Sequence, residues 1–146
     1  MATETGVMTV EFSNYLTSVV FNGGAVEKDW YLALYEYIGA DPKPPTPATT
    51  LTAATAWSGG MYKEITDYVG TRPKWDSKVN SGKVEFDFSP IPAGEERIIH
   101  GACLVSSAAK GSTTGVLALA WVDTTRTVVN NTMKVSRTVS PTFGAC

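Results

Sequence analysis

The sequence is poor in charged residues, which make up 18% of its 146 positions, whereas soluble domains average about 25%. The net charge is −2 and the pI is about 5.3. The strongest basic cluster, formed by Arg72, Lys74 and Lys78, is interleaved with Asp67 and Asp76. A protein that binds nucleic acid without sequence preference needs a basic face, so we expect no nucleic-acid partner.

Cysteine and histidine are also scarce. The cysteines, Cys103 and Cys146, show no CxxC spacing and His100 is the only histidine, so a structural zinc site is not expected. Cys103 lies in an apolar run and is expected to be a buried thiol. Cys146 is the last residue, where chains fray, and a disulfide between the two stays open. His100 could act as a general base or metal ligand, but without partner residues we favour a strand histidine hydrogen-bonded to the backbone.

Long apolar runs and catalytic motifs are absent from the sequence. No stretch approaches the length of a membrane span, and residues 1–12 lack the basic start and apolar run of a signal peptide, so we expect a protein made in a cytoplasm and soluble there. Glu95 and Glu96 are adjacent in a turn-like stretch, while Asp87 and Asp123 lack the spacing of a calcium loop. We expect no catalytic residue, no cofactor and no metal.

Hydrophobic residues make up 43% of the chain, enough for a core. In residues 11–22, EFSNYLTSVVFN, one face of a helix would carry Phe12, Tyr15, Leu16, Val19 and Val20. Asn22, Gly23 and Gly24 supply a C-cap. The residues Val19, Val20 and Phe21 also favour strands, but the spacing predicts a helix.

Period-two alternation follows the predicted helix. It predicts strands over 30–37 (WYLALYEY), 62–69, 83–89, 97–106 and 116–122, a short strand over 127–129, and a last strand over 133–139. Both faces of 30–37 are mostly apolar, so this strand should be central. In 83–89 the residues Val84, Phe86 and Phe88 should face the core.

The strand pattern sets the expected fold and domain organisation. Short strands spaced by roughly 10–15 residues, with no helical patterns between them, predict an all-β fold that is a β-sandwich or a barrel. One domain, 13–146, would follow an N-terminal arm of residues 1–12. Residues 39–60 contain four prolines and almost no charge, which predicts a long loop, and loops of this length are often functional.

Aromatic residues beside arginine suggest a contact surface. Residues 67–76, DYVGTRPKWD, contain side-chain types that are enriched in interface hot spots. Three readings stay open for this segment: a protein interface, packing at the edge of the core, or contact with a glycan. The strand 30–37 carries further aromatics that could lie at subunit faces. The predicted interface residues are Trp30, Tyr35, Tyr37, Tyr62, Tyr68, Arg72 and Trp75.

The order of the segments resembles a family of small tailed-bacteriophage virion proteins that are described as head-decoration-like or tail-fibre-like. Members open with a helix close to "SNYLxxxLL" and continue with a strand "YVALF" and the elements "GGxYxExxxY", "RPxW" and "HGxxLVxxAxxG". The corresponding segments here are 13–20, 31–35, 59–68, 72–75 and 100–111. The resemblance covers most of residues 13–139, and residues 1–12 and 140–146 have no counterpart.

The resemblance implies an antiparallel β-sandwich with jelly-roll character and a structural role in the virion, with no catalytic residues. The first hypothesis is a capsid decoration (cement) protein on the outer surface of the head. Its partners would be the major capsid protein and copies of itself in a trimer, and residues 1–12 and 39–60 would make contacts. The alternative is a tail, baseplate or fibre-like accessory that contacts tail proteins or a host-surface glycan. A sandwich glycosidase would need two carboxylates placed across a cleft, and no pattern indicates them.

Overall fold

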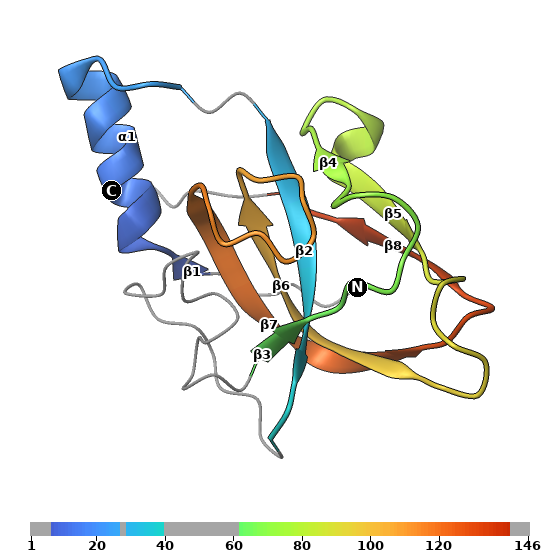
Figure 1. The fold of residues 1–146 in the computed structure, drawn as a ribbon. Helices are drawn as coiled ribbons and strands as arrows, with labels where there is room; N and C mark the ends of the chain where they lie inside the picture. Colours follow the sequence, from blue (N-terminus) through green and yellow to red (C-terminus); the bar gives the residue numbers. More distant parts are fainter. Residues whose placement is uncertain (1–6, 27–28, 40–61, 141–146) are drawn as a thin grey trace.

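The computed structural model describes residues 7–26, 29–39 and 62–140, which form one helix and eight strands. The helix is α1 (Val10–Asn22), and a short 3-10 turn, η2 (Asn80–Gly82), precedes β5. The strands are β1 (Val7–Met8), β2 (Trp30–Tyr37), β3 (Tyr62–Glu64), β4 (Lys74–Trp75), β5 (Lys83–Asp87), β6 (Arg97–Val105), β7 (Leu117–Val129) and β8 (Lys134–Thr138). The fold is mostly antiparallel β-structure with one helix near its start, which confirms the predicted all-β class (Figure 1).

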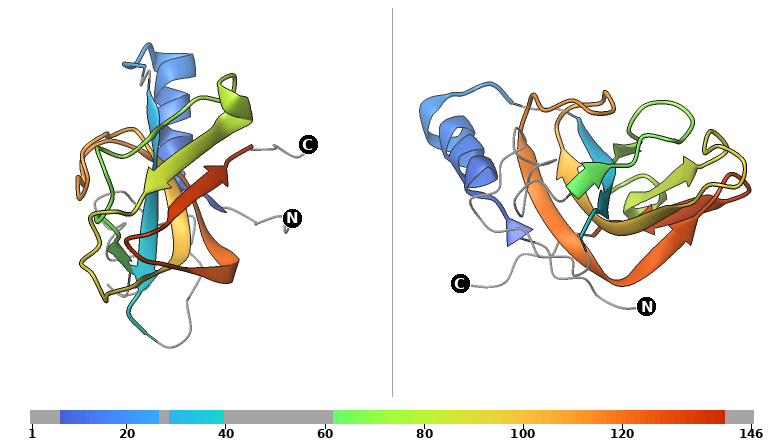
Figure 2. Two further views of the ribbon diagram at one scale, coloured as in Figure 1. Left: turned by 90° about the vertical axis from the view of Figure 1, so that its right-hand side faces the viewer. Right: turned by 60° about the horizontal axis from the view of Figure 1, so that its bottom comes forward.

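The strands form two sheets in which every pairing is antiparallel. The larger sheet has the order β1-β7-β6-β2-β3, and β4 pairs with the start of β2 whereas β3 pairs with its end. The smaller sheet consists of β5 and β8. Strand β2 is an interior strand of the larger sheet, since it pairs with β6 along one edge and with β3 and β4 along the other. Helix α1 lies on one side of the molecule and β5 and β8 on the other (Figures 1 and 2). The central position predicted for residues 30–37 is therefore confirmed.

The two sheets share one apolar cluster. Leu32, Leu34 and Ala102 reach it from the larger sheet, and Val84 and Phe86 reach it from β5. The other face of β2 joins a second buried cluster, which contains Ala33, Tyr35, Tyr37, Tyr62, Cys103, Val105, Leu117 and Ala120. Because successive strand residues point to opposite faces, one alternating segment supplies both clusters.

The helix is capped at both ends, and the C-cap is the one predicted from the sequence. Thr9 is buried, and its hydroxyl oxygen accepts a hydrogen bond from the Phe12 amide at 3.1 Å, which is an N-cap. Gly23 adopts the left-handed conformation with φ of 66°, and the Gly24 amide donates to the Ser18 carbonyl at 2.9 Å. This ends the helix at the predicted glycine pair.

Three boundaries differ from the sequence prediction. The segments 116–122 and 127–129 belong to one strand, β7, which runs 13 residues without a break. The strand expected over 62–69 is only three residues long. Residues 7–12, which we assigned to an arm, belong to the fold, since β1 pairs with β7 and α1 begins at Val10. Residues 1–6, nearly all of the predicted 39–60 loop and Cys146 lie outside the described residues.

Candidate interaction face

Five of the seven predicted interface residues lie inside the chain rather than on its surface. These are Tyr35, Tyr37, Tyr62, Tyr68 and Arg72, each at most 7% exposed. The four tyrosines pack in the two apolar clusters, and Arg72 forms a buried ion pair. Their side chains offer almost no surface to a partner, so the interface prediction is corrected to a core role for these five.

The Arg72 side chain is a fully buried anchor. Its Nε and Nη2 donate to the two carboxylate oxygens of Glu64 at 2.9 and 2.7 Å. Its Nη1 donates to the carbonyl of Ser107 at 3.0 Å, and its Nη2 to the carbonyl of Ser112 at 3.0 Å. The Gly111 amide donates to Glu64 at 3.0 Å. The pair therefore joins β3 to the loop between β6 and β7, and its role is structural.

Lys110 and Tyr68 reinforce the same loop. The Lys110 ammonium lies 4.1 Å from the centroid of the Tyr68 ring and donates to the Tyr68 carbonyl. The Tyr68 ring meets the Phe86 ring edge-on with centroids 5.0 Å apart. The segment 67–76 is thus tied into the core through Tyr68 and Arg72, which favours core packing over surface contact for these two residues.

Trp30 and Trp75 are the two predicted residues that remain partly exposed. They face each other as cross-strand partners of β2 and β4. The Trp75 indole donates to the Val139 carbonyl at 2.9 Å, which fixes its orientation. The two tryptophans line a groove of about 290 Å³, whose other apolar lining residues are Phe12, Leu104, Ala118 and Leu119, with Ser77 as a polar member. Sequence reasoning identified the tryptophans but not this groove.

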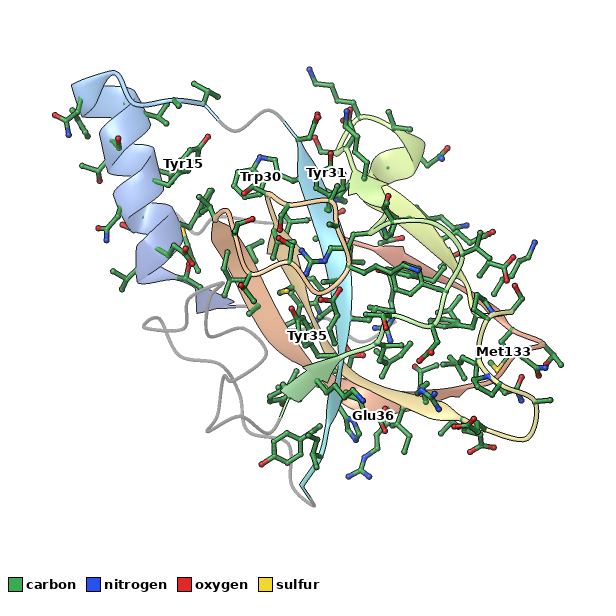
Figure 3. The ribbon with its side chains drawn as sticks, in the orientation of Figure 1. Tyr15, Trp30, Tyr31, Tyr35, Glu36 and Met133 are labelled. Atoms are coloured by element: carbon green, nitrogen blue, oxygen red, sulfur yellow. The ribbon has the colours of Figure 1, made fainter. Side chains whose placement is uncertain are left out.

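Helix α1 borders the groove through Phe12, and its side chains are half-buried or exposed. None of its residues is buried. The rings of Phe12 and Tyr15 pack edge-on against the Trp30 ring, with centroid distances of 5.6 and 5.9 Å. Figure 3 shows Tyr15 and Trp30. Beyond them Val20 is 68% and Phe21 79% exposed. On the predicted apolar face of the helix, Phe12 and Tyr15 thus pack against the sheet, whereas Val20 is exposed to solvent.

A second cleft, of about 600 Å³, lies at the other end of β2, where Glu36 is seen in Figure 3. It contains Glu95 and Glu96, the adjacent carboxylates noted in the sequence. Arg97 donates to Asp67 at 2.9 Å and to Glu95 at 3.4 Å. Because Arg97 pairs with the carboxylates of Asp67 and Glu95, the cleft contains both positive and negative charge. No cluster of metal-binding side chains occurs in the described part of the chain.

Asp87 and Asp123 have protein partners. Asp87 accepts from the Ser89 amide at 3.0 Å, a bond that lowers the pKa of its carboxyl. Asp123 forms an ion pair with Arg137 at 2.8 Å. These partners make a structural role the simplest reading of both carboxylates.

His100 is a strand histidine bonded to the backbone, as favoured from the sequence. Its Nδ1 accepts a hydrogen bond from the Tyr37 amide at 2.9 Å, and the side chain is buried. Burial, with a smaller contribution from the charge of Arg126, lowers the pKa of His100 below 6.5, although Glu36 and Asp123 act in the opposite direction. The neutral ring is therefore the form that the fold requires, because a protonated Nδ1 cannot accept from the amide.

A fall in pH is expected to destabilise the fold through His100. Because its folded pKa is depressed, the unfolded chain binds the proton first, and stability is lost as pH falls through about 6.5 toward the folded pKa. Each unit of depression is worth about 1.4 kcal/mol. Urea unfolding between pH 7.5 and 5 measures this, and His100→Asn keeps an acceptor that does not titrate. An equal pH slope in His100→Asn would show that other groups cause the loss.

The prediction that Cys103 is a buried thiol is confirmed. It is 0% exposed, and burial raises its pKa to about 12. The thiol forms a hydrogen bond with Tyr35 inside the second cluster. A neutral, inaccessible thiol does not act as a nucleophile, so Cys103 serves packing.

No helix in the described ranges is both long enough and apolar enough to span a membrane. Comparisons with protein-family models, with curated proteins and with solved structures gave no match. The candidate site therefore rests on geometry alone: the exposed apolar side chains of α1 and the apolar groove beside the helix.

Proposed function

We propose that this chain is a structural component of a bacteriophage virion, a capsid decoration (cement) protein that stabilises the assembled head through contacts between subunits. The observation that carries the proposal is the apolar face of α1 and the adjoining groove. Among the residues that the structure describes, six of the ten exposed large hydrophobic side chains lie between Met8 and Val26. A concentrated apolar surface is typical of a protein–protein contact, and the order of motifs in the sequence supports the virion as its setting.

The partners would be the major capsid protein and copies of the chain itself, arranged as a trimer on the outer surface of the head after synthesis in the host cytoplasm. Decoration sums many modest contacts over a lattice, so a small apolar face suffices in each subunit. The function needs no cofactor or catalytic group. We also propose that the two sheets form a sandwich with jelly-roll character, which is supported by the apolar cluster that they share.

The alternative function is a tail, baseplate or fibre-like accessory that contacts the host surface. The observation that favours it is the pair of partly exposed tryptophans, Trp30 and Trp75, in one groove. Aromatic faces stack on sugar rings, so a host glycan could occupy this groove. Trp75→Ala, which removes the aromatic face, should then reduce host adsorption of the phage, whereas unchanged adsorption counts against the alternative.

The decoration proposal predicts that altering the apolar face weakens binding to isolated heads. Val20→Gln/Phe21→Gln removes two exposed apolar side chains but keeps good helix formers. We expect roughly a hundredfold weaker co-sedimentation with tailless heads, since the variant removes two side chains whose burial contributes about 1.4 kcal/mol or more each, and each 1.4 kcal/mol corresponds to about a tenfold change. Val128→Gln, on exposed β7 surface, is the matched control.

Unchanged head binding by the double variant would refute the assignment of this face.

The predicted contact by the N-terminal arm needs a narrower test than removal of residues 1–12. Because Val7, Met8 and Thr9 belong to β1 and the helix cap, only residues 1–6 can be deleted without cutting into the described fold.

A further inference from the structure

The end of β2 is held to the large sheet by a side chain. The backbone pairing between β2 and β6 runs from Tyr31 to its last pair, Tyr35 with Gly101, and therefore stops before Tyr37. The Tyr37 amide donates instead to Nδ1 of His100 at 2.9 Å. At this position an imidazole ring takes the place that a backbone carbonyl has in a regular ladder.

Strand β6 is also irregular at His100 on its other edge. Its register with β7 shifts between Ile99 and Gly101, where residues 123–126 of β7 lie opposite His100. Such a bulge disrupts the ladder locally. The backbone pairing of β6 is thus interrupted on both edges at the one residue whose side chain holds the end of β2.

The segment that depends on this bond lies at the edge of the sheet. Glu36 and Tyr37 pair with Lys63 and Tyr62 of β3, and within the described residues no strand pairs with the outer edge of β3. Glu36, Tyr37 and Lys63 also line the cleft of about 600 Å³. The end of β2 and the start of β3 can therefore move without displacing another strand.

The next residues inward are held by contacts that do not involve His100. Tyr35 is fully buried and pairs with Gly101 on one edge of β2 and with Glu64 on the other. Both carboxylate oxygens of Glu64 accept hydrogen bonds from Arg72. An opening that begins at Tyr37 should therefore end at Tyr35 and Glu64.

We propose that His100 is an acid-sensitive latch, whose protonation releases the end of β2 and the start of β3 while the rest of the sheet stays closed. A protonated Nδ1 is a donor and cannot accept, so the Tyr37 amide loses its acceptor. The ring would also carry a charge in a buried site, which is unfavourable. This inference goes beyond the proposed function and does not rest on it.

Charged groups on the neighbouring strands act on the ring in both directions. Arg126 of β7 opposes protonation, whereas Glu36 of β2 and Asp123 of β7 favour it. Asp123 pairs with Arg137 of β8 at 2.8 Å, and Glu36 lies opposite Lys63 of β3, so each carboxylate has a cation beside it. Burial is the largest influence, and it lowers the pKa of the histidine.

The sign of the pH effect follows from this depressed pKa. In the open form the His100 ring is solvated and titrates near 6.5, whereas in the closed form its pKa lies lower. The open form therefore binds the proton first. Well above pH 6.5 the two forms should keep a constant ratio, and each pH unit below it raises the open fraction by at most about tenfold, until the closed form is protonated too.

The test is amide hydrogen exchange of the purified full chain, followed residue by residue by NMR at pH 7.5 and pH 5 and corrected for the effect of pH on the exchange chemistry. The Tyr37 amide should exchange faster at pH 5, by up to about tenfold for each unit below 6.5. The amides of Ala33 and Tyr35, which lie within the pairing with β6, should keep their rates. His100→Asn, whose acceptor does not titrate, should abolish the increase at Tyr37.

Unchanged exchange at Tyr37 would overturn the proposal, as would an equal increase at Tyr37 and Ala33, which would mean that the whole sheet opens. An acid response that persists in His100→Asn would assign it to another group. A second measurement needs no variant: the NMR signal of the Tyr37 amide should move with the midpoint at which the His100 ring titrates, and a different midpoint contradicts the latch. No heads are present in these measurements, so their failure leaves the proposed function unaffected.

Discussion

Replacing Arg72 by methionine is expected to lower the free energy of unfolding by about 3–5 kcal/mol, because it leaves a buried carboxylate without its partner. The Glu64 side chain is 3% exposed and receives two hydrogen bonds from Arg72. The same change frees the carbonyls of Ser107 and Ser112, which hold the loop between β6 and β7. Urea unfolding at neutral pH measures the loss.

The double variant Glu64→Leu/Arg72→Met should recover most of that loss, since two apolar side chains replace the pair and no charge stays buried. Lys74→Met is the matched control for removing a cation, because its ion pair with Asp29 is exposed on both sides; we expect little change there. A double variant as unstable as Arg72→Met would contradict the view that the unpaired carboxylate is the main cost.

Phe86→Ala is expected to cost about 3–5 kcal/mol, because a large side chain is removed from a closed core. Phe86 is 1% exposed, packs parallel to Phe88 with ring centroids 6.1 Å apart, and meets Tyr68 edge-on. It comes from the small sheet but belongs to the cluster that also contains Leu32 and Leu34 of the large one. The cavity therefore lies between the two sheets.

Phe86→Leu keeps an apolar side chain at the site and should lose clearly less stability than Phe86→Ala in thermal and urea unfolding. Both variants should unfold in a single transition, because the sheets share one core. Separate transitions for the two sheets, or equal losses in the two variants, would contradict a shared core at Phe86.

Local signals in the sequence predict much of this fold. The helix follows from apolar spacing and the glycine pair at its end, and the buried residues Val84, Phe86 and Phe88 follow from period-two alternation. The length of β7 does not follow, because its second half, DTTRTVV, is polar and mostly exposed. Within this segment residues 127–129 pair with residues 97–99 at the start of β6, and pairing between distant segments is invisible to local patterns.

The candidate site was predicted less well, for a physical reason. Aromatic and arginine side chains suit both interfaces and cores, so residue type alone could not separate Trp30 and Trp75 from the buried Tyr35 and Arg72. The partner of Arg72, Glu64, could have been suspected from the need to pair a buried charge. The exposure of α1 depends on which segments pack against it in three dimensions, which local sequence patterns do not state.

The low number of charged residues bears on both the stability of the fold and the proposed function. The chain places few charges, and in α1 only Glu11 is charged. Arg72 and Glu64 form an ion pair inside the fold, whereas the exposed side chains Leu16, Val20 and Phe21 of α1 are apolar.

The most direct measurement of the central claim is a binding titration of the wild-type protein onto mature heads that lack tails, with the bound protein separated by sedimentation. The account predicts saturable binding at a fixed number of copies per head. Absence of binding, or uptake that rises without saturation, would contradict the assignment to the head.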